Sequence, residues 1–371
     1  MPRSSVIAPP VVALLRRYED PGEPLSCERV TEGLLNRGYR LATTHGAYFL
    51  KHHLDGDHEA ITRQHRATQR LQTLGVPVAP PVEDLQGDTV AVIGGHCYAL
   101  HPWVDGRHRD GAQLTTLQSR RLGSLLGLVH TCLERVMNQR VEPGRGRIRQ
   151  RTYAHEFEKG SAHGFARGSG DEFGKVLGRE REYESAYPEE TFALIDELLA
   201  LARTASPRDA FDTLAEHRLL ERRALLTRHA HRRPPPASAG GWVHGDFHPL
   251  NLLYRGGEPA AIVDWDRLGV QPRAEEAVRA AAIFFVQPAG ELELTKVRAY
   301  ARAYRRAAGA DAAELAAAVH RVWWERLNDF WILRWRYQLH DRRADPQFAA
   351  VSALVEWWTR EYDAVREAFT A

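Results

Sequence analysis

The sequence predicts an α+β protein with an antiparallel-sheet N-terminal lobe and a mainly helical C-terminal lobe. Its 371 residues exceed the length of a typical single domain and suit two lobes around a cleft. Short β-prone runs separated by turn residues dominate the first hundred residues, and apolar residues at helical spacing dominate the remainder. We therefore expect an N-terminal lobe over 1–103 and a C-terminal lobe over 104–371.

The N-terminal lobe is expected to begin with a short helix at 11–18 and a linker at 20–26. A stretch without proline or glycine after Gly56 predicts a helix that ends at Gly75. Each expected strand is rich in β-branched or aromatic residues and is bounded by turn formers. These strands cover 39–43, 47–51, 89–93 and 97–101. Together they predict an antiparallel meander with one helix.

The C-terminal lobe is expected to consist of amphipathic helices around one hairpin. Apolar stripes at helical spacing occupy 122–133, 192–202 and 211–226. The segment 143–175 has no period and is expected to be a surface loop that either covers the active site or is disordered. A hairpin is expected at 241–266, and everything after Pro272 is expected to be helical.

Composition excludes several classes of protein. With 43% hydrophobic and 26% charged residues the chain is not globally disordered, and a net charge of +2 does not favour nucleic acid. Three widely separated cysteines, Cys27, Cys97 and Cys132, match no zinc or disulfide pattern. No apolar run is long enough for a membrane span. We expect a cytoplasmic monomer or homodimer.

The residues that carry chemistry gather in one stretch. His-Gly-Asp-Phe-His-Pro-Leu-Asn at 244–251 is followed thirteen residues later by Asp-Trp-Asp at 264–266. Phosphoryl transfer from a nucleotide needs a carboxylate at the attacking hydroxyl and oxygen ligands for Mg²⁺. Asp246, Asn251 and Asp264 supply these groups, and the hairpin would return Asp264 beside the loop. A polar hairpin without chemistry is the alternative.

This pair of motifs resembles that of the aminoglycoside phosphotransferase, choline kinase and type II homoserine kinase family. The resemblance extends from Val30 to Phe285 and is most specific at His-Gly-Asp-Phe-His-Pro-x-Asn and Ile-Val-Asp-Trp-Asp. It implies a protein-kinase-like fold with ATP and Mg as cofactors. It also implies that Asp246 is the catalytic base and that His244 braces its loop. Asn251 and Asp264 would hold magnesium.

Lys51 is a candidate phosphate ligand because it follows an apolar strand in a chain with only four lysines among 50 basic residues. A lysine there would pair with the α- and β-phosphates, and a solvated strand end is the alternative. The resemblance implies a glutamate on the next helix that holds this lysine. Glu59 and Gln64 are the candidates, and a rotation of about 140° between them means that only one faces Lys51. Charge favours Glu59.

Backbone groups are expected to contact the nucleotide at two further places. Asn36 lies between Gly33 and Gly38, in a turn whose amides would reach the phosphates unless it is an ordinary turn. Trp103 and Val104 lie where the lobes join, and their backbone would bind the adenine edge. For Trp103, simple packing between the lobes is the alternative.

The sequence does not identify the acceptor. The resemblance implies transfer of the γ-phosphoryl group to a hydroxyl of a small polar molecule, such as an amino sugar, a sugar or an aminoglycoside-type antibiotic. Eighteen acidic residues against seventeen basic ones over 241–371 argue against a polycationic acceptor. Acidic groups at 275–276 and 341–345 would still suit one or two amino groups. A homoserine- or choline-type kinase and a non-catalytic nucleotide-binding pseudokinase are the alternatives.

Several other residues have two interpretations. Trp324, Trp331 and Trp335 are expected on one helical face, which would either stack on an acceptor or form core. Asp266 would lie behind magnesium or at a solvated hairpin end, and His130 is expected to be a core histidine.

Overall fold

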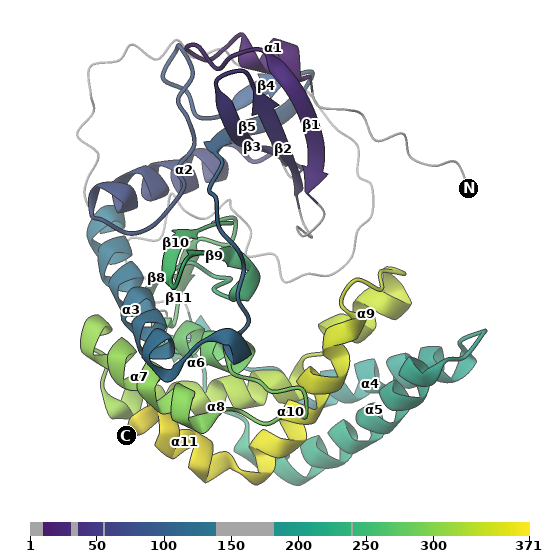
Figure 1. Cartoon of the computed structure of the whole chain (residues 1–371). Coiled ribbons are helices and arrows are strands. Elements are labelled where there is room, and N and C mark those ends of the chain that lie inside the picture. Colours follow the sequence, from purple (N-terminus) through teal and green to yellow (C-terminus); the bar gives the residue numbers. More distant parts are fainter. Residues whose placement is uncertain (1–9, 31–35, 55, 139–181, 239) are drawn as a thin grey trace.

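The computed structural model describes residues 10–30, 36–54, 56–138, 182–238 and 240–371. It places a sheet above a large group of helices (Figure 1). The sheet is antiparallel with five strands in the order β1-β2-β3-β5-β4. The strands are β1 Pro24–Val30, β2 Arg37–Thr43, β3 Gly46–His53, β4 Ala91–Ile93 and β5 His96–Pro102. The four strands expected from the sequence are therefore present.

Strand β1 differs from the sequence prediction, which placed a linker over its first three residues and no strand over the rest. Its residues are half-buried or exposed throughout, and Leu25 is 69% exposed. A strand at the edge of a sheet needs no apolar alternation, because only its backbone must pair. The strand therefore lacks the alternation of apolar and polar residues that predicts a strand, because it contains the polar residues Ser26, Glu28 and Arg29.

Two helices belong to the N-terminal elements, α1 Val11–Leu15 and α2 His58–Thr73. Helix α2 begins at Asp57, whose carboxylate accepts a hydrogen bond from the Ala60 amide at 2.9 Å, and Gly75 follows with a φ of +79°. Helix α1 packs into a small core with the inward side chains of the sheet, and this core consists of Leu14, Leu15, Tyr18, Tyr39, Leu41, Leu50, Ala91, Tyr98 and Leu100.

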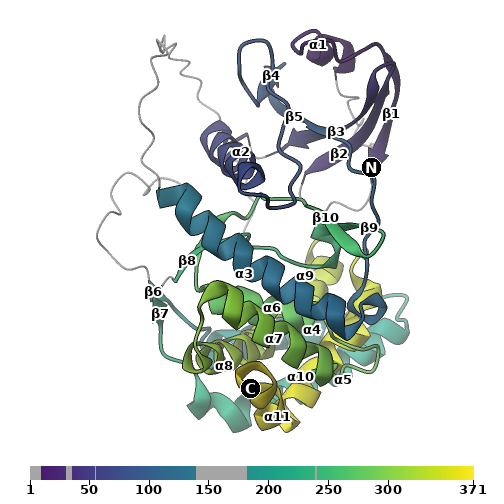
Figure 2. The ribbon, with the colours of Figure 1, turned by 60° about the vertical axis from the view of Figure 1, so that its left-hand side comes forward.

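The larger core lies among the C-terminal helices. These are α3 Thr116–Asn138, α4 Pro188–Thr204, α5 Ala210–His229, α6 Arg273–Phe284, α7 Leu294–Ala308, α8 Ala312–Asn328, α9 Trp331–Gln338, α10 Phe348–Arg360 and α11 Tyr362–Thr370. Short 3₁₀ turns are η1 Gly111–Gln113, η3 Ala230–Arg232, η4 Pro249–Asn251 and η5 Asp345–Gln347. Helix α3 lies between α2 and α7 (Figure 2). Ala67 and Leu71 of α2 join this core, which ties the helix to the lower part of the molecule.

Two small antiparallel pairs lie between the sheet and the helices (Figure 1). They are β8 Gly241–Val243 with β11 Gly269–Gln271, and β9 Leu252–Arg255 with β10 Glu258–Ile262. A third pair, β6 Glu182–Tyr183 with β7 Ala237–Ser238, lies apart from them. The expected hairpin at 241–266 is present as β9 and β10, whereas β8 pairs with β11 instead.

The helical face expected for three tryptophans does not exist. Helix α8 ends at Asn328, so Trp324 lies on α8 whereas Trp331 and Trp335 lie on α9. Asp329 and Phe330 interrupt the helix, and the Asp329 carboxylate accepts a hydrogen bond from the Trp331 amide at 3.1 Å. The segment 143–175 lies outside the described residues.

Candidate active site

The two motif loops lie side by side because of strand pairing. The loop 244–251 connects β8 to β9, and the loop 263–268 connects β10 to β11. Since β8 pairs with β11 and β9 with β10, both ends of the two loops are held together. The Val263 amide also donates to the Asn251 carbonyl at 2.9 Å. Asp246, Asn251 and Asp264, predicted from their spacing, thus lie on adjacent loops.

Unusual backbone conformations accompany this contact. Gly245 has a φ of +87°, and a Cβ atom there would lie 2.1 Å from the Arg267 carbonyl oxygen. Only glycine permits this approach between the loops. Asp264 has a φ of +59°, a left-handed conformation that aspartate tolerates better than most residues. Such positions are common at functional sites.

A buried hydrogen-bond network holds the loop from behind. His244 is fully buried, its Nδ1 accepts from the Asp246 amide at 3.2 Å, and its Nε2 donates to the Val263 carbonyl at 3.0 Å. Burial lowers the pKa of His244, so the ring is neutral and can both accept and donate. His244 therefore joins the two motif loops through their main chains.

Glu276 of α6 is the acid at the centre of this network. Its carboxylate accepts from the amides of His244 and Gly245, at 3.2 and 2.5 Å, and from His130 Nε2 at 2.7 Å. Glu276 is only 2% exposed; burial raises its pKa, but the His130 hydrogen bond and charge outweigh burial and keep the pKa below the usual value. The other ring nitrogen of His130 lies 3.1 Å from the Tyr304 hydroxyl. His130 is thus a core histidine that supports the loop.

Asp246 lies at the open side of the loop, with 32% of its side chain exposed. Its Oδ2 is 3.6 Å from His248 Nε2 and 3.8 Å from Arg267 Nε. Burial raises the pKa of Asp246, but the His248 hydrogen bond and the charges of His248 and Arg267 outweigh it, so the pKa lies below the usual value. Asp246 is therefore an ionised carboxylate that can accept a proton.

Asn251 and Asp264 have the donor chemistry that suits Mg²⁺. The Asn251 amide nitrogen donates to the Asp246 carbonyl at 2.8 Å, and among the described residues its oxygen accepts no hydrogen bond. The Asp264 side chain is 42% exposed. Mg²⁺ typically takes one or two protein oxygens together with substrate phosphates, so this pair fits the ion. The described residues contain no cluster of three or more His, Cys, Asp or Glu side chains that could hold a metal.

Lys51 of β3 reaches across from the sheet to the second motif. Its Nζ lies 2.8 Å from Asp264 Oδ1 and 2.6 Å from Asp266 Oδ1, and the lysine side chain is only 12% exposed. Burial lowers the pKa of Lys51, but the two carboxylates outweigh burial and keep the ammonium charged. Burial raises the pKa of Asp264, but the charge of Lys51 outweighs it and holds that pKa well below its usual value. Lys51 therefore forms one charged cluster with Asp264 and Asp266, on the loop that lies beside the loop of Asp246.

Glu59 is not brought to Lys51. It lies exposed in the first turn of α2, where an acid stabilises the positive end of the helix dipole. Gln64, on a different side of the helix, donates from Nε2 to the Asp266 main-chain carbonyl at 3.0 Å. The side of α2 that faces the site thus carries the amide rather than the acid.

The side chain of Asn36, which the sequence placed in a phosphate-binding turn, also contacts Asp266. Its Nδ2 donates to Asp266 Oδ2 at 2.5 Å, and its Oδ1 accepts from the Leu54 amide at 2.9 Å. Both polar groups of this side chain are therefore used. Gly33 lies outside the described residues, and Gly38 forms part of β2.

The connection between the lobes leaves the Val104 amide available as a main-chain donor. The Trp103 amide donates to the Ala47 carbonyl at 3.1 Å, and its ring lies beneath the Arg40 guanidinium, 5.3 Å from ring centroid to Cζ. Pro102 has no amide hydrogen. The Val104 amide follows, and it has no hydrogen-bond partner among the described residues. Val104 is thus the first main-chain donor after β5 that a ligand can use.

The acidic groups considered for acceptor recognition already have partners. Glu275 Oε1 lies 2.8 Å from Arg321 Nε, and Asp341 Oδ2 lies 2.6 Å from Arg343 Nη2. Asp345 pairs with Arg336. Of the tryptophans in this region, Trp323, Trp324 and Trp358 are at most 1% exposed and form core.

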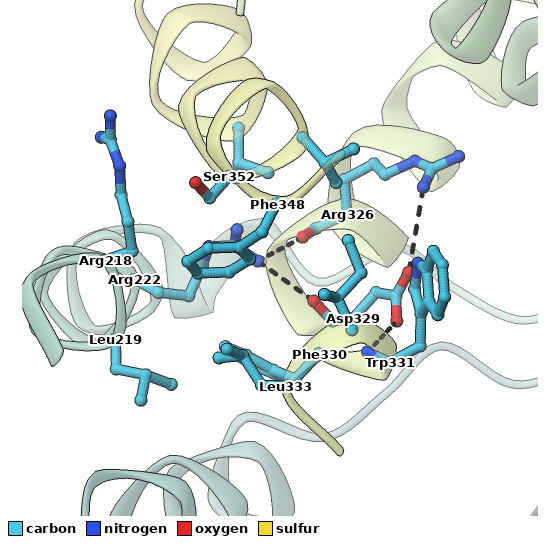
Figure 3. Close-up of a pocket in the computed structure, with 13 residues that line it drawn as sticks. Arg218, Leu219, Arg222, Arg326, Asp329, Phe330, Trp331, Leu333, Phe348 and Ser352 are labelled. Carbon is cyan, nitrogen blue, oxygen red and sulfur yellow. Dashed lines mark hydrogen bonds and ion pairs between the residues drawn. The ribbon is translucent and has the colours of Figure 1, made fainter. Parts of the chain in front are cut away.

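A small cavity of about 30 Å³ lies among α5, α8, α9 and α10 (Figure 3). Arg222 reaches into it and donates to the main-chain oxygens of Arg326 and Leu327, where α8 ends. Trp331 and Asp329 lie at its side. None of Asp246, Asn251 and Asp264 lines this cavity, which has room for little more than a water molecule.

Glu276 and Asp266 are the functional neighbours that sequence reasoning missed or undervalued. Glu276 carried a signal: it shares the apolar face of α6 with Ala280 and Phe284, four and eight residues later, where an acid needs buried partners. For Asp266 the sequence offered a place behind magnesium or a solvated hairpin end, and its side chain is only 19% exposed. Nothing in the sequence indicated its partners, which come from three segments distant in sequence.

Comparisons with known proteins bear on the family and the fold of the chain. A model of the phosphotransferase enzyme family matches residues 26–310. The structure of amicoumacin kinase with AMP-PNP, Ca²⁺ and Ami is 18% identical, with a TM-score of 0.55 over 96% of this chain and 92% of that chain. Spectinomycin phosphotransferase with ADP and spectinomycin is 14% identical, with a TM-score of 0.55 over 97% and 96%.

The microcompartment-associated aminopropanol kinase is 16% identical, with a TM-score of 0.54 over 97% of this chain and 98% of that chain. No curated protein matches the chain. At such low identities these likenesses establish the fold alone, and they confirm the kinase-like architecture expected from the sequence. Among the described helices, none is both long and apolar enough to cross a bilayer.

Proposed function

This chain belongs to the phosphotransferase enzyme family, as its motifs predicted, and we propose that it transfers the γ-phosphoryl group of ATP to a hydroxyl of a small polar molecule. The observation that carries the proposal is the convergence of Lys51, Asp246 and Asp264 from two lobes and two loops. A division of labour between 1–103, for the nucleotide, and 104–371, for the chemistry and the acceptor, belongs to the same proposal.

Asp246 is the proposed catalytic base. Its carboxylate accepts the acceptor's hydroxyl proton while the oxygen forms a bond to the γ-phosphorus and the bond to the β–γ bridging oxygen breaks, which releases ADP. Its depressed pKa keeps the carboxylate ionised at neutral pH. His244 is a positioning residue, because the hydrogen bonds of its ring nitrogens hold the main chains of both motif loops.

Asn251 and Asp264 are the proposed magnesium ligands. When bound, Mg²⁺ neutralises the charge that develops on the phosphates during transfer. The free oxygen of Asn251 and the exposed carboxylate of Asp264 support this role. Lys51 would add a compact positive charge for the α- and β-phosphates, and the free Val104 amide would bind the adenine edge.

The acceptor is proposed to be a sugar, an amino sugar, an antibiotic or an amino alcohol. The names of the similar structures include an amicoumacin kinase, a spectinomycin phosphotransferase and an aminopropanol kinase, and these names guide the choice of compounds. The acidic groups at 275–276 and 341–345 are engaged in ion pairs or in the loop network, so they give little support to a strongly cationic acceptor.

The test is a screen for acceptor-dependent ADP release with ATP and Mg²⁺. The compounds are amino sugars, neutral sugars, aminoglycosides, spectinomycin, amicoumacin, homoserine, choline and aminopropanol, and Asp246→Asn serves as the control. We expect at least one compound to stimulate ADP release by the natural chain but not by the variant. Nucleotide binding without ADP release for any compound would favour the pseudokinase alternative.

A further inference from the structure

Three side chains of the N-terminal elements meet at Asp266. Lys51 Nζ lies 2.6 Å from Oδ1, and the Asn36 amide donates to Oδ2 at 2.5 Å. Gln64 donates to the main-chain carbonyl of the same residue at 3.0 Å. These donors come from β3, from the residue before β2 and from α2. Both carboxylate oxygens and the carbonyl oxygen of Asp266 are therefore occupied.

The two carboxylates that hold Lys51 differ in their surroundings. The Asp264 side chain is 42% exposed, and Asp264 is the one proposed to bind magnesium. The Asp266 side chain is 19% exposed, and Asn36 fixes its second oxygen. A carboxylate that Asn36 already holds through one oxygen, on a main chain that Gln64 holds through its carbonyl, is the better anchor for a flexible lysine. Less side-chain entropy is lost when such a carboxylate pairs with the lysine, because the carboxylate is already ordered.

We propose that Asp266 is the anchored carboxylate that positions Lys51 for the nucleotide phosphates, the task for which the sequence suggested Glu59. Glu59 is exposed on α2, whereas Gln64 of the same helix supports Asp266. Asp266 is thus a positioning residue that acts through Lys51, and Asn36 and Gln64 hold it in place. This inference rests on the proposed nucleotide-binding function.

A double-mutant cycle on nucleotide binding tests the inference without knowledge of the acceptor. Isothermal titration with Mg²⁺ and AMP-PNP would compare the natural chain with Asp266→Asn, Lys51→Ala and the double variant. We expect Asp266→Asn to weaken binding about tenfold, on the scale of one charge-assisted hydrogen bond. In the Lys51→Ala background the same change should have less than about a twofold effect, because residues that act through one another are not additive.

Asp105→Asn, a change at an exposed aspartate, is the matched control and should bind nucleotide as the natural chain does. Equal effects of Asp266→Asn in both backgrounds, or no effect in the natural background, would overturn the inference while leaving the proposed function intact. A natural chain that binds no nucleotide would overturn both.

A second measurement decides the matter if the double variant does not fold. The chain has only four lysines, so acylation of Lys51 can be followed by mass spectrometry against Lys296 as an internal reference. Lys296, on α7, donates to the Gly111 carbonyl at 2.9 Å rather than to Asp266. We expect Asp266→Asn to increase Lys51 labelling at least about twofold, since one of its two partners loses its charge. Unchanged labelling would contradict the proposal.

Discussion

The two sides of the proposed active site are held in different ways. The loop that carries Asp246 is fixed from behind by Glu276, His130 and His244, all of which are fully or almost fully buried. Lys51, on the nucleotide side, is fixed by two carboxylates across the boundary between the lobes, and one of them is 42% exposed. The proposed base is therefore held in place without a ligand, whereas a nucleotide that binds as proposed would have to rearrange the lysine contacts.

This difference suits the chemistry. A base works best when its position does not change during the reaction, because no free energy is then needed to reorganise it. A phosphate ligand must exchange its partner when the nucleotide enters and leaves. Changes on the base side should therefore reduce turnover, and changes on the nucleotide side should mainly weaken binding.

The largest effect is expected from Asp246→Asn. The amide cannot accept the hydroxyl proton, so kcat with an accepted substrate should fall by about 10³-fold, within the range for loss of a general base. Nucleotide affinity and the melting temperature should stay close to those of the natural chain. A variant that retains a tenth of the activity would remove Asp246 from the role of base.

The second effect concerns the support behind the loop. Glu276→Gln replaces one acceptor oxygen by a donor that must face the Gly245 amide, the His244 amide or His130. A displacement of the base by about 1 Å can cost about 10²-fold in rate, so kcat should fall by that order while nucleotide affinity changes little.

Glu275→Gln is the matched control for this support, because Glu275 pairs with Arg321 rather than with the catalytic loop. Its kcat should stay near that of the natural chain. If Glu276→Gln were as active as Glu275→Gln, the buried network would have no part in placing Asp246.

A smaller effect is expected from the loss of one main-chain donor on the nucleotide side. Val104→Pro removes the amide hydrogen that has no partner among the described residues. Nucleotide binding should weaken about three- to tenfold, the value of one hydrogen bond, whereas Val104→Ala keeps the donor and should bind normally. Equal affinity in the two variants, measured by titration calorimetry, would place the adenine edge elsewhere.

The smallest effect on the site is expected from a change at Asp84, which stabilises the N-terminal lobe and does not contact the site residues that the structure describes. Its side chain is 2% exposed and accepts from Arg17 at 2.6 Å and from the amides of Gln86 and Asp88. Asp84→Asn should lower the free energy of unfolding by about 1–3 kcal/mol at neutral pH, with catalysis per folded molecule unchanged. The exposed Asp88→Asn is its control.

The ion pair of Asp84 with Arg17 predicts that the stability of the fold depends on pH. Burial raises the pKa of Asp84, but Arg17 and the two amides outweigh it, so the folded-state pKa lies below the usual value. Its stabilisation is therefore complete above the unfolded pKa of about 4 and is lost as the pH falls through the folded value. Denaturation curves for natural chain and variant should converge in acid, and a constant difference down to pH 2 would contradict this account.

The sequence predicted the features that depend on short motifs or on a common pattern of residue types. Asp246, Asn251 and Asp264 lie in two short motifs, and their spacing sufficed to place them on neighbouring loops. The strands β2, β3 and β5 have apolar residues with turn formers at their ends, and all three were found. Strand β1 was missed because an exposed edge strand has no such pattern.

What could not be predicted depends on contacts between distant segments. The partners of Asp266 are separated from it by about two hundred residues, and no spacing rule connects Asn36, Lys51 and Gln64 to one carboxylate. Charge favoured Glu59 as the partner of Lys51, but the direction in which a helix faces is decided by packing, here by Ala67 and Leu71 in the larger core.

The central claim is that Asn251 and Asp264 hold magnesium beside an ionised Asp246, and the most direct test is the effect of Mg²⁺ on AMP-PNP affinity. Titrations with and without Mg²⁺ would compare the natural chain with Asp264→Asn. We predict that Mg²⁺ strengthens binding to the natural chain at least about tenfold and has little effect on the variant. The same magnesium dependence in both proteins, or none in the natural chain, would contradict the assignment of this site.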